Sequence, residues 1–131
     1  MKLSSLLHRD IGYSSVSWHA SETFPGVRFA VKRASLGQRI ELNQRVRELT
    51  LKHEFLRAGD AAGQLEAALS DLLAEKLYLE WGLERIEGLS IDGQEATTAA
   101  LIASGPEILT NEIAGVIQKE NNLTDDERKN S

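Results

Sequence analysis

Three histidines are the side chains best suited to metal binding or proton transfer, and their spacing builds no recognisable site. His53 falls on the apolar stripe of a predicted helix, whereas His8 and His19 lie in the segment before it. A metal site on one helix needs a second histidine or a carboxylate three or four residues away on the same face. The neighbouring Glu54 points to a different face. A packed histidine at the edge of the core is the better interpretation of His53, and we expect no metal and no cofactor.

Other residue types exclude further kinds of chemistry. The sequence has no cysteine, which excludes a thiolate nucleophile, a disulfide and a cysteine-based zinc site. The scattered glycines form no phosphate-binding loop, and the GLSIDG segment lacks the alternating oxygen ligands of a calcium loop. We therefore expect a protein that is not an enzyme.

Arginines on the same predicted helix raise the question of nucleic-acid binding. Arg39, Arg45 and Arg47 could form a basic ridge. Glu41 and Glu48 are interleaved with them, which is typical of a solvated helix face. With 20 acidic and 15 basic side chains the net charge is −5, which disfavours a general nucleic-acid binder. A helical regulator using these arginines stays an alternative, but we expect no nucleic-acid partner.

The chain length of 131 residues is enough for one domain with a single core. The first ten residues, MKLSSLLHRD, contain no apolar run long enough for a signal peptide. No segment approaches the roughly 18 apolar residues that indicate a transmembrane helix. We expect a cytoplasmic protein with no membrane partner.

The segment Asp60–Gly93 contains the longest helical pattern, and the rest of the chain is expected to pack around it. Asp60 is a suitable N-cap, and Gly88 is placed to end the helix in the left-handed conformation. The apolar face is wider than a one-sided surface helix requires, so we interpret it as core, with Leu72 and Leu79 at its centre. Its members are Leu65, Leu69, Leu72, Leu73, Leu77, Leu79, Trp81, Leu83 and Ile86.

Residues 1–34 predict an N-terminal arm and a β-hairpin. Val16 and Trp18 alternate with polar residues, as in a half-buried strand, and Val27, Phe29 and Val31 do so more clearly. The Pro25-Gly26 pair between the two runs indicates a turn. A two-stranded hairpin is marginally stable alone, so its apolar face must pack on helices or pair with another chain. A homo-oligomer formed through this face therefore stays open.

The remaining segments predict a mainly α fold, a small helical domain of about four helices with that N-terminal hairpin. Ser35 is the expected N-cap of a helix that runs to about residue 58, and a short connection at Gly59 makes it antiparallel to the next helix. Helices are expected over 95–103 and from Pro106 to about Asn121, after a turn at Asp92-Gly93. The predicted division is 1–34, a helical domain over 35–121 and a polar tail over 122–131.

Several strings in the chain resemble small proteins encoded in tailed-phage and prophage tail modules, and in particular the tail assembly chaperones of long-tailed (siphovirus-like) phages. The resemblance runs through residues 26–130, in GVRFAVKRASLGQRIEL, VREL, KHEFLRAG, LYLEWGLERIEGLSIDGQEAT, LIASGPEILTNEIAGVI and LTDDERKN. The most distinctive part is the segment WGL-x-x-I-x-GL-x-IDG-x-x-AT.

The resemblance implies a non-enzymatic role in viral assembly inside the bacterial host cytoplasm. Chaperones of this kind bind the long, helical tape measure protein, keep it in solution and help the tail tube protein polymerise around it. No catalytic residues define the family, so none is transferred. The polar ending LTDDERKNS fits the junction at which a frameshifted, longer product would begin.

Tyr78 and Trp81 are the aromatic side chains that we expect to contact a client. Aromatic residues supply a large contact area at low entropic cost. Trp81 extends the leucine face and is also explained as core, whereas Tyr78 is expected on the other side of the helix. The alternative function is a structural subunit of the phage tail or of the head–tail connector, with the hairpin as an edge for strand pairing.

Overall fold

The computed structural model describes residues 10–54 and 61–121, and over these residues it combines four helices with five short strands. The predicted helical fold with an N-terminal hairpin is confirmed at this level, and three strands were not expected. In chain order the elements are β1 (Val16–Ala20), β2 (Arg28–Lys32), α2 (Leu36–Glu54), α3 (Ala61–Gly82), β3 (Leu83–Glu87), β4 (Ser90–Ile91), β5 (Gln94–Glu95), α4 (Thr98–Ser104) and α5 (Glu107–Asn121).

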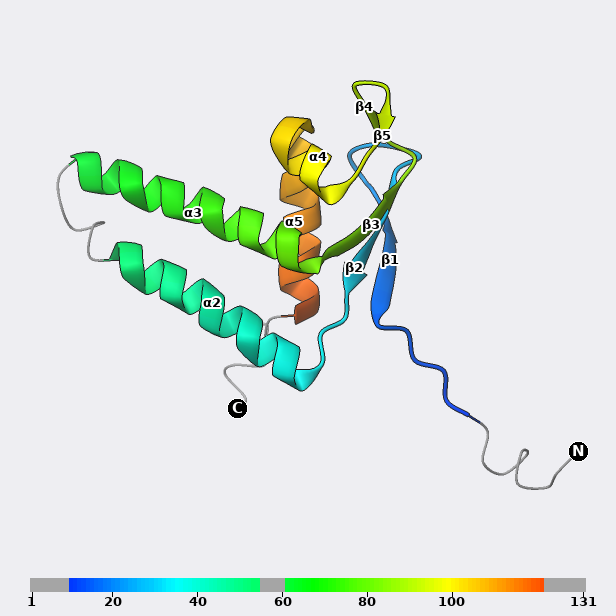
Figure 1. Ribbon diagram of the computed structural model, residues 1–131, viewed down its shortest axis with the longest axis horizontal. Helices are drawn as coiled ribbons and strands as arrows, with labels where there is room; N and C mark the ends of the chain where they lie inside the picture. Colours follow the sequence, from blue (N-terminus) through cyan, green and yellow to red (C-terminus); the bar gives the residue numbers. More distant parts are fainter. Residues whose placement is uncertain (1–9, 55–60, 122–131) are drawn as a thin grey trace, which may run out of the picture.

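Helices α2 and α3 form an antiparallel pair that projects from the rest of the molecule as a two-helix arm (Figure 1). Helix α2 begins as predicted, because the Ser35 hydroxyl accepts a hydrogen bond from the Gln38 N–H at 3.2 Å. The Gln38 side chain accepts one from the Ser35 N–H at 2.9 Å, which completes a capping box. The predicted helix stop at Gly59 and the N-cap at Asp60 lie outside the described residues.

Helix α3 ends at Gly82, six residues earlier than the expected stop at Gly88, so the prediction of one helix through Ile86 is wrong. Leu83 and Ile86 lie instead on β3, opposite Val31 and Phe29 of β2. The register shifts between Ala30 and Val31, leaving one extra residue in β3. Such a bulge brings two residues three apart to the same face of the sheet, a spacing that imitates a helix in the sequence.

Glycines permit the two close approaches that join the sheet to its surroundings. Gly88 has a φ of +83°, and a Cβ there would lie 2.2 Å from the carbonyl oxygen of Gly26. Its predicted left-handed conformation is therefore confirmed, although it follows a strand. A Cβ on Gly82 would lie 2.7 Å from Cγ2 of Ile117, so the end of α3 lies directly against α5.

The antiparallel sheet has the order β1-β2-β3, with β2 in the centre. The apolar face of the hairpin is covered within the chain, because Val27, Phe29 and Val31 are all buried. They pack in a core with side chains from the helices, among them Leu42, Tyr78, Leu79, Leu101, Leu109, Ile113 and Ile117.

The orientation of β1 differs from the prediction of an apolar inner face. Trp18 is exposed and the guanidinium of Arg28 lies 4.8 Å from its ring centroid, whereas Ser17 is buried. The polar face of β1 points inward because a carboxylate of α5 lies on that side. The Ser17 hydroxyl donates a hydrogen bond of 3.2 Å to Glu120. A half-buried strand was correct, but the buried side is the polar one.

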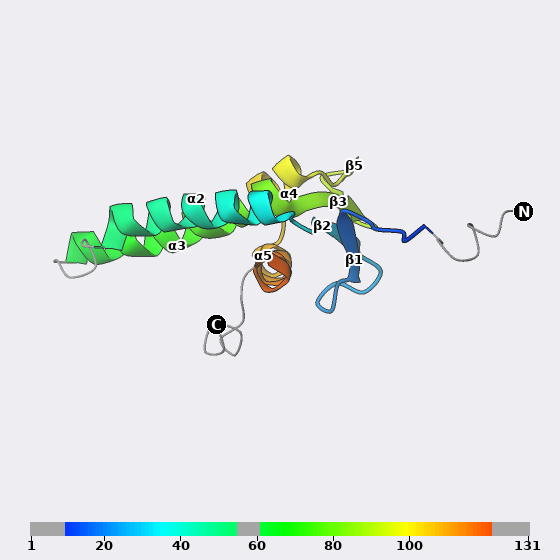
Figure 2. The ribbon, with the colours of Figure 1, turned by 90° about the horizontal axis from the view of Figure 1, so that it is seen from below.

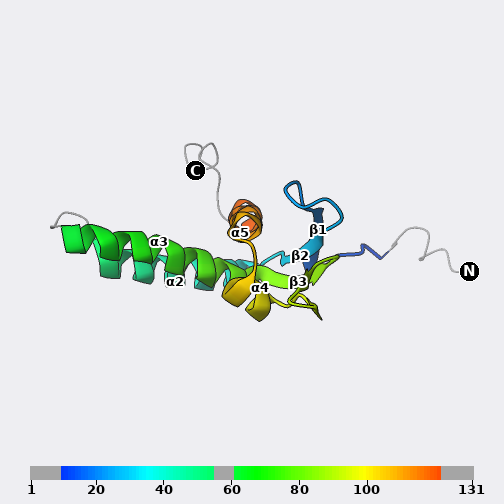
Figure 3. The same ribbon diagram turned by 90° about the horizontal axis from the view of Figure 1, so that it is seen from above.

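Helices α4 and α5 hold the arm to the sheet. Figures 2 and 3 show α5 on one side of the base of the arm, and α4 towards the other. Helix α5 is anchored at its end by Asn121, whose amide donates to the carbonyls of Lys32 and Ile117. Near its middle, Glu112 accepts hydrogen bonds from Ser21, the Glu22 N–H and Thr23. The predicted helix from Pro106 to Asn121 is confirmed as α5. Helix α4 begins at Thr98, and Thr97 is its N-cap.

Candidate functional site

The outer half of α3 carries large apolar side chains that the described part of the chain leaves exposed. Leu65, Leu69 and Leu72 are 72%, 45% and 54% exposed, whereas Leu79 near the inner end is 2% exposed. Helices α4 and α5 pack against the inner half of α3 only (Figure 1). The prediction that the whole leucine face is core is therefore wrong for the outer half, where no described element covers it.

These three exposed leucines form a continuous line, the leucine ridge, defined as Leu65, Leu69 and Leu72. Their spacings of four and three residues are those of the a and d positions of a coiled coil, and Lys76 and Leu79 continue the line inward. The line is exposed along the ridge and passes beneath α4 at Leu79. A helical partner that followed it would lie along α3 and meet the end of α4.

A pocket of 240 Å³ lies where the leucine ridge meets α4 and α5. Apolar side chains from α3 and α4 form part of its wall, and two carboxylates and one amine accompany them. The lining residues are Leu72, Glu75, Lys76, Leu79, Leu101, Ile102, Gly105, Glu107 and Thr110. The pocket thus combines an apolar wall with two carboxylates and a single amine, so negative charge is in excess, which suits an amphipathic side chain with a cationic end.

The carboxylate of Glu75 is the most perturbed acidic group of this region. Burial raises its pKa, and the negative charge of Glu107 raises it further. The second effect is a repulsion between like charges, and a cation placed between the two carboxylates would relieve it.

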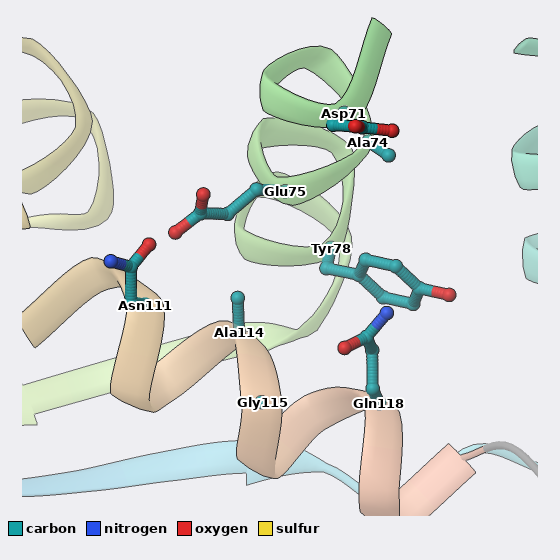
Figure 4. Close-up of a pocket in the computed structure, with 8 residues that line it drawn as sticks. All are labelled: Asp71, Ala74, Glu75, Tyr78, Asn111, Ala114, Gly115 and Gln118. Atoms are coloured by element: carbon teal, nitrogen blue, oxygen red, sulfur yellow. The ribbon is translucent and has the colours of Figure 1, made fainter. Parts of the chain in front are cut away.

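Glu75 also lines a second pocket, of 350 Å³, on the α5 side of α3 (Figure 4). The amide of Asn111 faces its carboxylate, and the ring of Tyr78 lies one helical turn further along α3. Gly115 leaves the α5 wall open, because among the described residues no atom beyond its chain neighbours and its own helix backbone lies within 4 Å of the position its Cβ would take. Glu75 therefore separates two open pockets.

The two aromatic residues predicted to bind a client occupy different environments. Tyr78 is 4% exposed and belongs to the core, so the expectation that it lies apart from the core, on the other side of the helix, is wrong. Its side of α3 is the one on which α5 packs, which the helical period could not reveal. Trp81 is half-buried against the core, and the Lys32 ammonium lies 4.7 Å from its ring centroid. A role for either residue in client binding stays a prediction.

One cluster resembles catalytic machinery in composition but not in geometry. The Ser17 hydroxyl lies 2.9 Å from Nε2 of His19, and Glu120 lies 3.3 Å from the same nitrogen. In a serine–histidine–carboxylate triad the carboxylate holds the opposite nitrogen, Nδ1, and so orients the ring for proton transfer. Here both partners share Nε2, and the cluster joins β1 to α5. Sequence reasoning missed it because residues 17 and 120 are far apart in the chain.

The described residues hold no group of three or more histidine, cysteine, aspartate or glutamate side chains that could bind a metal ion. The side chain of His53 and the whole of His8 lie outside them. Within residues 10–54 and 61–121, no helix is both long enough and apolar enough to cross a membrane.

Comparison with protein-family models, curated proteins and solved structures finds no match to this chain.

Proposed function

We propose that this chain is a tail assembly chaperone of a long-tailed phage or prophage, which binds the tape measure protein in the cytoplasm of the bacterial host. The sequence resemblance supplies the family, and one structural observation supports the proposal: the exposed leucine ridge on a projecting helical arm. The proposed role is non-enzymatic. By keeping the tape measure protein in solution, the chaperone allows the tail tube protein to polymerise around it.

The physical basis is that the leucine ridge can cover an apolar surface of the client before the client's final partners do. A long helical client exposes apolar stripes until its final partners arrive, and an exposed helix face with coiled-coil spacing can cover such a stripe. Burying one leucine side chain fully contributes about 1.5–3 kcal/mol, so a ridge of partly exposed leucines supports reversible binding. Reversibility is what a chaperone needs, because the client must later be released.

Co-expression tests the proposal. The full chain, produced with the tape measure protein of the same gene cluster, should move that client from the insoluble to the soluble fraction and co-purify with it. The triple variant Leu65→Ser/Leu69→Ser/Leu72→Ser should lose this effect.

The matched control changes equally exposed apolar residues on α2, as Leu36→Ser/Ile40→Ser/Leu51→Ser. It should retain the effect, with an unchanged far-ultraviolet circular dichroism spectrum for both variants. Failure of the wild-type chain to solubilise or bind the client would refute the chaperone role.

A structural subunit of the tail or of the head–tail connector is the second candidate, and one observation favours it. Strand β1 lies at the edge of the three-stranded sheet, and its residue Trp18 is exposed. An edge strand offers unpaired backbone groups to another chain. A structural subunit would be found in purified particles, from which a chaperone should be absent, so mass spectrometry of those particles separates the two candidates.

A further inference from the structure

We infer that the leucine ridge and its pocket select a basic amphipathic helix, one that places a lysine or arginine side chain between Glu75 and Glu107. This inference rests on the proposed function and specifies the chemistry of the client segment. It commits to a helix of another protein as the occupant, on the basis of charge complementarity.

The flanks of the ridge are acidic. Helix α3 carries Glu66, Asp71, Glu75 and Glu80, and its single basic residue is Lys76. Glu66 and Glu80 follow members of the a and d line directly, and Glu75 precedes one, so these three occupy flanking e and g positions, and the apolar Ala68 and Leu73 occupy the other two. In coiled coils those positions determine which partner is accepted, through attraction between opposite charges.

The same charges disfavour a second copy of this chain on the ridge. Two α3 helices joined through their ridges would bring glutamates to the e and g positions of both helices, in a parallel or an antiparallel arrangement. Like charges placed side by side are destabilising. A partner helix with lysine or arginine at its own flanking positions meets attraction in place of this repulsion.

The pocket provides a defined binding position for one basic side chain of the client helix. A lysine or arginine stem can lie along the apolar wall formed by Leu72, Leu79 and Ile102, while its charged end reaches the carboxylates of Glu75 and Glu107. Arginine suits this position especially, because its planar guanidinium can bind two carboxylate groups at once. The two carboxylates come from α3 and α5, so the anchor exists only in the folded protein.

Two synthetic peptides of about three heptads test the inference. Both carry leucine at a and d, and they differ only at e and g, where one has lysine and the other glutamate. Binding of each labelled peptide to the full chain is measured by fluorescence anisotropy. The lysine peptide should bind at least about 10-fold more tightly in low salt, and this preference should shrink to about 2-fold in 0.5 M NaCl.

Matched variants locate the effect. The double variant Glu75→Gln/Glu107→Gln, which removes both carboxylates of the pocket, should reduce the preference at least about 3-fold while keeping the leucine-dependent part of binding. The control Glu41→Gln/Glu48→Gln removes two exposed carboxylates from α2 and should leave the preference unchanged. The triple serine variant of the ridge should abolish binding of both peptides.

Three outcomes would overturn the inference. Equal binding of the two peptides would show that the acidic flanks do not select, and binding that survives the ridge variant would place the lysine peptide elsewhere. Self-association in analytical ultracentrifugation that is lost in the ridge variant would make a second copy the occupant. Each outcome can coexist with a client that is solubilised in co-expression, so the proposed function and this inference fail separately.

Discussion

Replacing Leu79 and Leu72 with alanine, one at a time, measures how far the covered part of α3 extends. The two residues lie seven apart on one line of the helix, yet Leu79 is 2% exposed and Leu72 is 54% exposed. Each substitution removes three methylene-sized groups, worth about 0.8 kcal/mol apiece when fully buried. Leu79→Ala also leaves a cavity between α3 and α4, so it should cost about 2–5 kcal/mol. Leu72→Ala loses only about half of the transfer term and leaves no closed cavity, so it should cost about 1 kcal/mol or less.

Urea titration followed by circular dichroism gives both free energies of unfolding, provided that the transitions are two-state with equal slopes. A loss above about 2 kcal/mol for Leu72→Ala would show that the outer half of α3 is covered in solution. A loss below about 1 kcal/mol for Leu79→Ala would show that α4 does not bury it. Either result would refute the division of α3 into a covered inner half and an exposed ridge.

Three further predictions concern the elements that hold the arm in place. Tyr78→Ala should cost about 3–5 kcal/mol of stability, measured by the same titration, because the ring is buried; a loss near zero would mean that the ring is free to bind a client. Gly88→Ala should lower the unfolding temperature clearly more than Gly93→Ala does, since both have positive φ but only Gly88 contacts the Gly26 carbonyl; equal effects would contradict that close approach. Burial opposes ionisation of Glu112, but hydrogen bonds from Ser21, the Glu22 N–H and Thr23 outweigh it and lower the pKa below 4.5. Because the folded pKa is the lower one, the stabilisation by Glu112 is present above pH 4.5 and is lost as the pH falls through the folded pKa. The difference in unfolding free energy between wild type and Glu112→Gln should therefore shrink on acidification, and a difference independent of pH would exclude this origin.

The sequence alone predicted the turns and helix caps correctly, because their geometry depends on residues that are close together in the chain. The Pro25-Gly26 turn forms with a hydrogen bond from the Val27 N–H to the Phe24 carbonyl at 3.1 Å. Ser35 caps α2, and Asp92-Gly93 turns the chain between β4 and β5 with both residues at positive φ. Caps and turns follow from side-chain chemistry within four residues, so the sequence alone specifies them.

Only the tertiary structure decided where α3 ends and which of its faces are covered. Leu83 and Ile86 continue the helical period, but pairing with β2 through a bulge makes them strand residues. Tyr78 is buried because α5 packs on its side of α3, and Leu65, Leu69 and Leu72 are exposed because α4 and α5 reach only the inner half of the helix. Periodicity records which side chains share a face, whereas burial depends on whether another element lies against that face. Whether a face is buried therefore depends on contacts between residues far apart in the chain.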